Sequence, residues 1–196
     1  SGGKAQVNVS VGTFAPKPQT PFQWVSVDSF EQIDAKQNLL KKELGRGIKF
    51  SWTKPEDTMI EAFLSRGDRR LADVILTAWK NGAKFDAWGD QRKFEVWLDA
   101  FNEHGLDPTF YTHRERRVDE IFPWEHLSTA VRKKFLFQDY QDSREGSVRV
   151  DCREQCFACG ILPTFNDLRR ENPGKVWMCP EVKVRKKKAI PVSEIS

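Results

Sequence analysis

The sequence predicts an α+β fold that is mainly helical and contains two or three short strands. Two patterns lead to this prediction. Apolar residues recur every three to four positions through much of the chain between residues 28 and 140, which is the spacing of amphipathic helices. Val7, Val9 and Val11 alternate instead with small polar residues, which is the two-residue period of a strand. The chain is therefore expected to be helical, with a small sheet at its N-terminal end.

The composition agrees with a globular protein. The 196 residues are 39% hydrophobic and include seven Trp and fourteen Phe, which is ample for a core, while 31% are charged and can solvate a surface. No apolar run approaches the roughly 20 residues that span a bilayer, and no signal segment is present. We therefore expect a cytoplasmic protein with no membrane partner. The net charge of +4 is too small to indicate nucleic-acid binding by itself.

The first half of the chain divides at its prolines and glycines. Three prolines within six residues exclude a helix between residues 15 and 24. Asp28 or Ser29 is expected to cap the first helix, which two glycines end at positions 45 and 47. Residues 48–52 are expected to form a second strand. Thr53 to Glu56 combine a capping-box pattern with a proline, which predicts another helix start.

The second half is expected to contain three further helices. Asp68 is expected to cap a helix over about 69–80, and another helix is expected over about 91–104. Residues 106–127 contain two prolines and are expected to be irregular. Ser128 is then expected to cap a helix that carries Val131, Phe135, Leu136 and Tyr140 on its apolar face.

Four cysteines lie in the last quarter of the chain, and the first 150 residues contain none. Cys152, Cys156 and Cys159 form a Cys-x3-Cys-x2-Cys group, and Cys179 follows. Such clustering is typical of a metal or iron–sulfur site, although four cysteines also permit two disulfides. If Cys179 is a ligand, four thiolates close the site, as in structural zinc or an electron-transfer cluster. If it is not, one coordination position stays open for chemistry.

Other candidate residues carry weaker signals. His126 is the best placed of the three histidines for a function, and binding a loop carbonyl is its structural alternative. Lys17 lies in the proline-rich segment and is a candidate for substrate contact, or for simple solvation. A basic stretch at 113–117 and the Lys183–Lys188 tail form a candidate surface for RNA, with a solvated tail as the alternative.

Several segments resemble one enzyme superfamily. The run from Val9 to Trp24, with its Phe-x-Pro-x-Pro-x-Thr-Pro-Phe pattern, resembles the end of the catalytic barrel in radical S-adenosylmethionine enzymes. Later pieces resemble the C-terminal region of uncharacterised radical enzymes that carry an N-terminal cobalamin-binding-type domain. These pieces are residues 48–52, 62–71, 83–88, 105–108 and 122–126, so that the resemblance covers most of residues 7–160.

The resemblance implies a domain layout and a set of cofactors. Residues 1–25 would end a truncated barrel, with the first strand as the last barrel strand. Residues 26–145 would form a helical region, 146–182 a cysteine segment and 183–196 a basic tail. The full enzyme would use S-adenosylmethionine and a [4Fe–4S] cluster, whose three thiolates come from a Cys-x3-Cys-x2-Cys loop early in the barrel.

Two departures set Cys152, Cys156 and Cys159 apart from that loop. They follow the last expected barrel strand, and Ala158 stands where the family has an aromatic residue, with Phe157 one place early. We therefore expect a distinct auxiliary site for a [4Fe–4S] cluster, or alternatively zinc, in the C-terminal fragment of a radical enzyme. Its partners would be the upstream barrel, an electron donor and an RNA substrate, and the fragment alone would be inactive. The alternative is a zinc-stabilised, non-enzymatic nucleic-acid-binding module.

Overall fold

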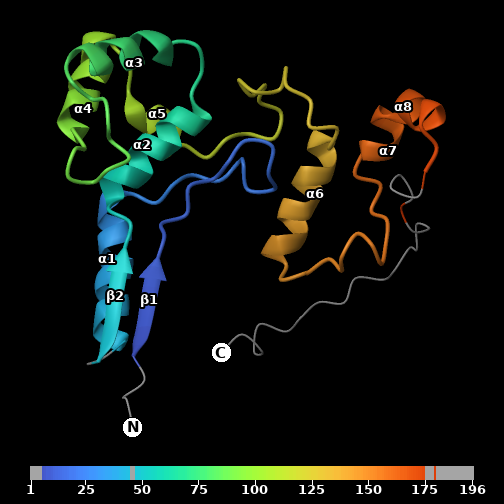
Figure 1. Cartoon of the computed structure of the whole chain (residues 1–196), viewed down its shortest axis with the longest axis horizontal. Coiled ribbons are helices and arrows are strands. Elements are labelled where there is room, and N and C mark those ends of the chain that lie inside the picture. Colours follow the sequence, from blue (N-terminus) through green and yellow to red (C-terminus); the bar gives the residue numbers. More distant parts are fainter. Residues whose placement is uncertain (1–5, 45–46, 175–178, 180–196) are drawn as a thin grey trace. The chain divides into compact units, whose positions relative to one another are not determined.

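A computed structural model describes residues 6–44, 47–174 and 179, and the described chain forms two compact units (Figure 1). The first unit contains the residues up to Pro18 and those from Trp24 to Pro123. The second contains Gln19–Gln23 and the residues from Trp124 onward. The four cysteines belong to the second unit.

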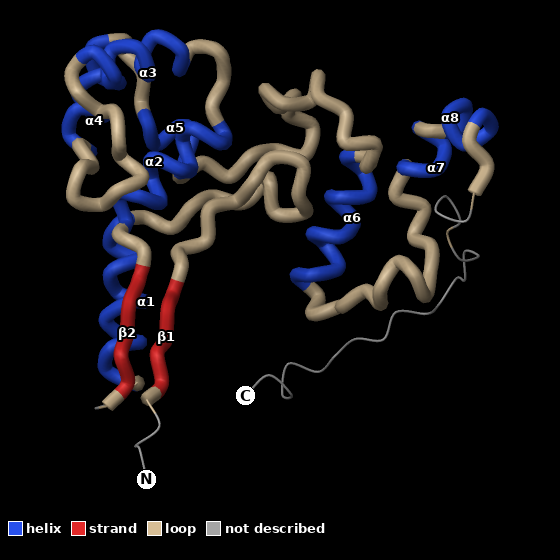
Figure 2. Tube along the Cα trace, viewed as in Figure 1, coloured by secondary structure: helices blue, strands red, loops and turns tan. Residues whose placement is uncertain are grey.

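The sheet of the first unit consists of two parallel strands, β1 (Val7–Val11) and β2 (Ile48–Trp52). Val7 lies opposite Ile48 and Val11 lies opposite Trp52 in the register. The helix α1 (Phe30–Glu43) lies between the strands in the sequence, as the connection of parallel strands requires (Figure 2). Both predicted strands are therefore confirmed.

The start of α1 is a capping box built on Ser29. The Ser29 hydroxyl accepts a hydrogen bond from the Gln32 backbone N–H at 3.3 Å, and the Gln32 side-chain oxygen accepts one from the Ser29 N–H at 2.8 Å. Gln37, buried on the same helix, donates to the Thr53 carbonyl at 3.1 Å. This contact joins the helix to the end of β2. Of the two residues predicted to cap the first helix, Ser29 is the N-cap and Asp28 is not.

The next helix, α2 (Pro55–Arg66), has a different start from the predicted one. Its N-cap is Lys54, which makes no side-chain capping bond, so the capping box predicted from Thr53 is wrong. The backbone explains the difference, because the Thr53 N–H donates to the Val11 carbonyl at 3.0 Å. Thr53 thus continues the strand pairing. The predicted proline in the first turn is confirmed at Pro55.

Three shorter helices follow, α3 (Leu71–Lys80), α4 (Phe94–Glu103) and α5 (Pro108–Thr112). The first two confirm the predicted helices but begin two and three residues later. The N-cap of α3 is Arg70, so the prediction that Asp68 caps this helix is wrong. The Asp68 carboxylate instead accepts a hydrogen bond from the Arg70 backbone N–H at 3.0 Å in the preceding turn. The third helix lies in the segment predicted to be irregular. Asp107 caps it by accepting the Thr109 N–H at 2.8 Å.

The core of the first unit lies between these helices. Phe63 of α2 packs against two rings of α4, with centroid distances of 5.4 Å to Trp97 and 4.9 Å to Phe101. The main cluster comprises Ile60, Phe63, Leu71, Val74, Ala78, Ala83, Trp97, Ala100, Phe101 and Tyr111. The apolar periodicity that predicted the helices identified their buried faces only in part, because Leu64 of α2 and Ile75 and Trp79 of α3 are exposed.

The second unit contains α6 (Lys133–Arg144), α7 (Ile161–Thr164) and α8 (Asn166–Glu171). The predicted cap at Ser128 is wrong, and Val131 lies outside the helix. The Ser128 hydroxyl instead accepts the Ala130 N–H at 3.2 Å, and Ala130 adopts a left-handed φ of 64° that a helix start cannot contain. The helix begins only after Arg132.

The predicted class is confirmed. Among the described residues the structure is α+β and mostly helical, with 43% of them in helices and a two-stranded parallel sheet. The barrel origin of the first strand stays a prediction. Within the described ranges, no helix combines the length and the apolar composition that crossing a membrane requires.

Candidate metal centre

The four cysteines lie in the second unit, on both sides of its two short helices. Cys152, Cys156 and Cys159 belong to the loop between α6 and α7, and Cys179 follows α8. All four are free thiols, two of them half-buried and two exposed. The disulfide alternative is therefore not the arrangement in this structure.

Cys179 lies near Cys156 despite its distance from it in the sequence. Its pKa is raised, first by burial and then by the charge of Cys156. Cys156 also hydrogen-bonds the Cys179 side chain, and Cys159 and Cys152 add further repulsion against its thiolate. These interactions indicate that Cys179 lies near Cys156 and within electrostatic range of the other two thiols. This arrangement corresponds to the four-thiolate alternative of the sequence analysis.

The thiols are neighbours, but they do not enclose a metal position. Among the described residues, no three His, Cys, Asp or Glu side chains converge closely enough to hold an ion. Four thiolates are nevertheless the donor set that zinc and iron–sulfur clusters prefer. Mutual repulsion between thiolates opposes their convergence when no cation is present, so the chemistry of the donors fits a metal that draws them together.

The backbone around Cys159 is fixed by its own turn and by the segment before α6. Ala158 and Gly160 both have positive φ values, 54° and 119°. A Cβ on Gly160 would lie 2.8 Å from the Ala130 carbonyl oxygen, so only glycine fits this approach. The Cys159 carbonyl also accepts the Arg132 N–H at 2.9 Å. The Cys156–Cys159 turn is therefore held at its C-terminal end before any metal binds.

Cys152 stands between two opposite charges in the sequence, Asp151 and Arg153, which pair with each other. The pKa of Arg153 is raised, chiefly by its hydrogen bonds to the Asp151 carboxylate, and the thiolate of Cys152 adds to this effect. Arg153 is largely exposed, so water screens its charge strongly. Its contribution to holding an anionic four-thiolate centre is consequently expected to be small.

The other two candidate residues are Lys17, in the first unit, and His126, in the second. The Lys17 ammonium pairs with Glu61 of α2 in the first unit, which explains its position without a substrate. His126 is exposed in the turn where the Leu127 N–H donates to the Trp124 carbonyl at 3.0 Å. The assignment of both residues to substrate binding stays a prediction.

The basic stretch at 113–117 is occupied by internal ion pairs. Arg114 forms a two-pronged contact with Glu120 at 2.7 and 2.8 Å, and Arg116 contacts the same carboxylate at 3.2 Å. Arg117 pairs with Asp119. Most of this charge is thus neutralised within the unit, which weakens the case for an RNA surface there. The Lys183–Lys188 tail lies outside the described residues.

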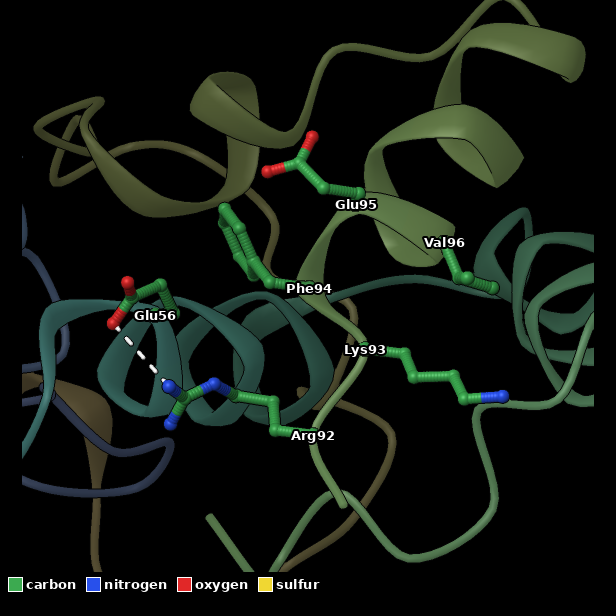
Figure 3. A pocket seen from close by; sticks show the side chains of 6 residues that line it. All are labelled: Glu56, Arg92, Lys93, Phe94, Glu95 and Val96. Atoms are coloured by element: carbon green, nitrogen blue, oxygen red, sulfur yellow. Dashed lines mark ion pairs between the residues drawn. The ribbon is translucent and has the colours of Figure 1, made fainter. Parts of the chain in front are cut away.

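The described part of the first unit also contains two hollows. One has a volume of about 400 Å³ and is lined by Glu56 and by residues 92–96. In it the Arg92 side chain points at Glu56, with Arg92 Nη2 3.7 Å from Glu56 Oε2 (Figure 3). Arg92 also pairs with Asp57, so its charge is already balanced. The other, of about 710 Å³, is mostly apolar, with Trp79 and Trp97 in its walls. Neither contains a nucleophile paired with a base.

Comparisons with protein-family models, curated proteins and solved structures found no match for this chain. The case for a metal centre therefore rests on the four thiols and on the groups that hold their loop. Sequence reasoning identified all four cysteines. It did not identify Gly160 or Arg132 as supports, although a glycine directly after a Cys-x2-Cys pair is a usable signal for a positive φ.

Proposed function

We propose that the chain is the C-terminal part of a radical S-adenosylmethionine enzyme in which Cys152, Cys156, Cys159 and Cys179 hold an auxiliary metal centre. The observation that carries the proposal is the interaction of Cys179 with Cys156 and, through charge, with Cys159 and Cys152. The centre we propose is a [4Fe–4S] cluster, and a single zinc ion is the alternative for the same donors. The link to radical enzymes rests on the sequence resemblance.

Four thiolates make this a closed site. Cleavage of S-adenosylmethionine in the superfamily needs a cluster with one iron free of protein ligands, and a fourth cysteine removes that free position. The proposed centre is therefore separate from the radical-generating cluster, which an upstream barrel would supply. When bound, a closed cluster would supply electron transfer, whereas zinc would supply folding stability alone.

The composition of the second unit supports a need for metal. Its described buried apolar residues are few, namely Trp124, Ala130 and Leu136, whereas the first unit contains both described core clusters. Small units with little buried apolar surface usually need a disulfide or a metal for stability. A metal that binds the four thiolates would connect the α6–α7 loop to the segment after α8.

The sheet supports an upstream partner for the first unit. Parallel strands normally occur in larger sheets that are covered on both faces. Here, β1 and β2 pair only with each other among the described residues, and Val7 is 55% exposed. Additional barrel strands from the upstream region of the same protein would pair with this sheet and cover it.

The zinc alternative has one observation in its favour. Cys152 and Cys179 are exposed, and zinc tolerates exposure to solvent and oxygen better than an iron–sulfur cluster does. In that case the chain is a zinc-stabilised module that binds nucleic acid through its basic tail. Its RNA affinity would fall steeply with salt, and neutralising Lys183–Lys188 would reduce that dependence.

Serine substitutions test the ligand set. Each of the four Cys→Ser variants is expected to lose the metal or to bind it with a changed spectrum, whereas His126→Ala should bind as the unmodified chain does. The measurement is a cobalt(II) titration of the metal-free chain, followed by the thiolate charge-transfer band. A Cys179→Ser variant with an unchanged band would reject the four-thiolate site. Stoichiometric binding of S-adenosylmethionine would contradict the closed site.

A further inference from the structure

Arg149 lies between α6 and the cysteine loop and contacts both. Its guanidinium carbon is 4.9 Å from the ring centre of Phe135 on α6 and 5.0 Å from that of Phe157, which stands between Cys156 and Ala158. Contacts of this kind are attractive, because the ring faces are negative and the guanidinium is positive. One cation therefore joins the helix to the turn that carries two of the thiols.

Two carboxylates of α6 fix the orientation of this guanidinium. Arg149 Nε lies 2.5 Å from Asp139, and its Nη2 donates to Asp142 at 2.9 Å. Asp139 and Asp142 stand one helical turn apart, so they present neighbouring acceptors along the same face. Ionic contacts thus hold the guanidinium in position while it contacts both rings.

We propose that Arg149 is the positioning residue of the thiolate centre: through Phe157 it holds the Cys156–Cys159 turn against α6. This inference rests on the proposed metal site and extends it to a residue that is not a ligand. The turn is then anchored at both ends, by Phe157 on Arg149 and by the Cys159 carbonyl on the Arg132 N–H. Mutation of residues that orient the ligands of a metal without binding it typically lowers metal affinity by about 10- to 100-fold.

The contact also explains why the aromatic residue stands one place early in this cysteine group. Ala158 adopts a left-handed conformation, which a bulky side chain disfavours, so the ring occupies position 157 instead. There it packs on Arg149. A lysine at position 149 would keep the charge but would lack the planar group that two rings and two carboxylates contact together.

The test compares Arg149→Met and Arg149→Lys with Arg153→Met, a matched control whose arginine is in the same loop and 87% exposed. The first readout needs no metal: the rate at which Ellman's reagent modifies the reduced thiols of the full chain. Both Arg149 variants should react faster than the control. The second readout is the rate at which EDTA removes bound cobalt(II). Both Arg149 variants should release it roughly 10- to 100-fold faster than the control.

A double variant separates a positioning role from general destabilisation. If Arg149 acts through Phe157, then Arg149→Met should add little to the effect of Phe157→Leu on cobalt release. Additive effects, or thiol reactivity equal to that of the control, would overturn the inference while leaving the metal site intact. A parent chain that binds no cobalt would reject the proposed function, and the metal-free thiol rates would still decide the role of Arg149.

Discussion

Replacing Gly160 by alanine should disrupt the cysteine loop. At a φ of 119° an L residue is strained by about 1–3 kcal/mol. The new Cβ would also lie 2.8 Å from the Ala130 carbonyl oxygen, a backbone atom that cannot rotate away. Moving these segments apart threatens the Arg132–Cys159 hydrogen bond, worth about 1 kcal/mol. Together these effects give a loss of about 2–4 kcal/mol.

Hydrogen–deuterium exchange of the Arg132 amide measures this loss directly, because that N–H donates across the contact. With about 1.4 kcal/mol for each tenfold change, Gly160→Ala should speed its exchange by roughly 30- to 1,000-fold. Gly174→Ala is the matched control, since its Cβ would meet nothing within 4 Å. Tryptophan fluorescence is less suitable, because most of the seven tryptophans belong to the first unit. Equal protection in Gly160→Ala and the control would refute the reasoning.

Three further predictions concern charge. Hydrogen bonds from Arg114 lower the pKa of Glu120 from its ordinary 4.5. The ionised Glu120 therefore stabilises the folded state fully above pH 4.5, and this stabilisation is lost as the pH falls through the lowered pKa. At pH 7 the free energy of unfolding of Glu120→Gln in urea should therefore be about 1–3 kcal/mol lower than that of the unmodified chain. It should also decrease less on acidification, and an equal pH dependence of the unfolding free energy in the two proteins would contradict this. Burial and the charge of Arg116 lower the pKa of Arg66 to about 10, so the Arg66 charge is unfavourable where it lies. Adding Arg66→Met to Glu120→Gln should therefore restore part of the lost unfolding free energy. A further decrease in the unfolding free energy of the double variant would contradict this prediction. Neutralising Lys183–Lys188 should reduce the salt dependence of RNA binding if the nucleic-acid alternative holds, and an unchanged dependence would eliminate it.

Sequence periodicity predicted the elements better than it predicted their ends. The alternating valines and the helical spacing of apolar residues identified β1, β2 and the longer helices, because burial of one face requires those periods. The caps depended on tertiary contacts that local patterns do not contain. Thr53 stays with the sheet because Val11 accepts its N–H, and Ser128 does not begin a helix because Ala130 turns left-handed. The short α5 was predictable, since Asp107 followed by proline is a typical helix start.

The candidate site was likewise predictable from the sequence only in part. The spacing of the cysteines predicted a thiolate cluster, and the placement of Cys179 near Cys156 needed the fold. Arg149 could not be identified from sequence, because its role depends on contacts with both Phe135 and Phe157 that only the fold brings together. A cation between two aromatic rings that lie 22 residues apart leaves no local pattern in the sequence.

The metal and acid-labile sulfide content of the chain, purified without oxygen, tests the central claim most directly. We predict one four-thiolate centre per chain, with iron and sulfide in equal amounts and a broad visible absorption, and loss of that centre in Cys179→Ser. One zinc without sulfide would keep the four-thiolate site and select the structural alternative. A chain that contains neither metal nor sulfide, and takes up neither on reconstitution, would contradict the claim.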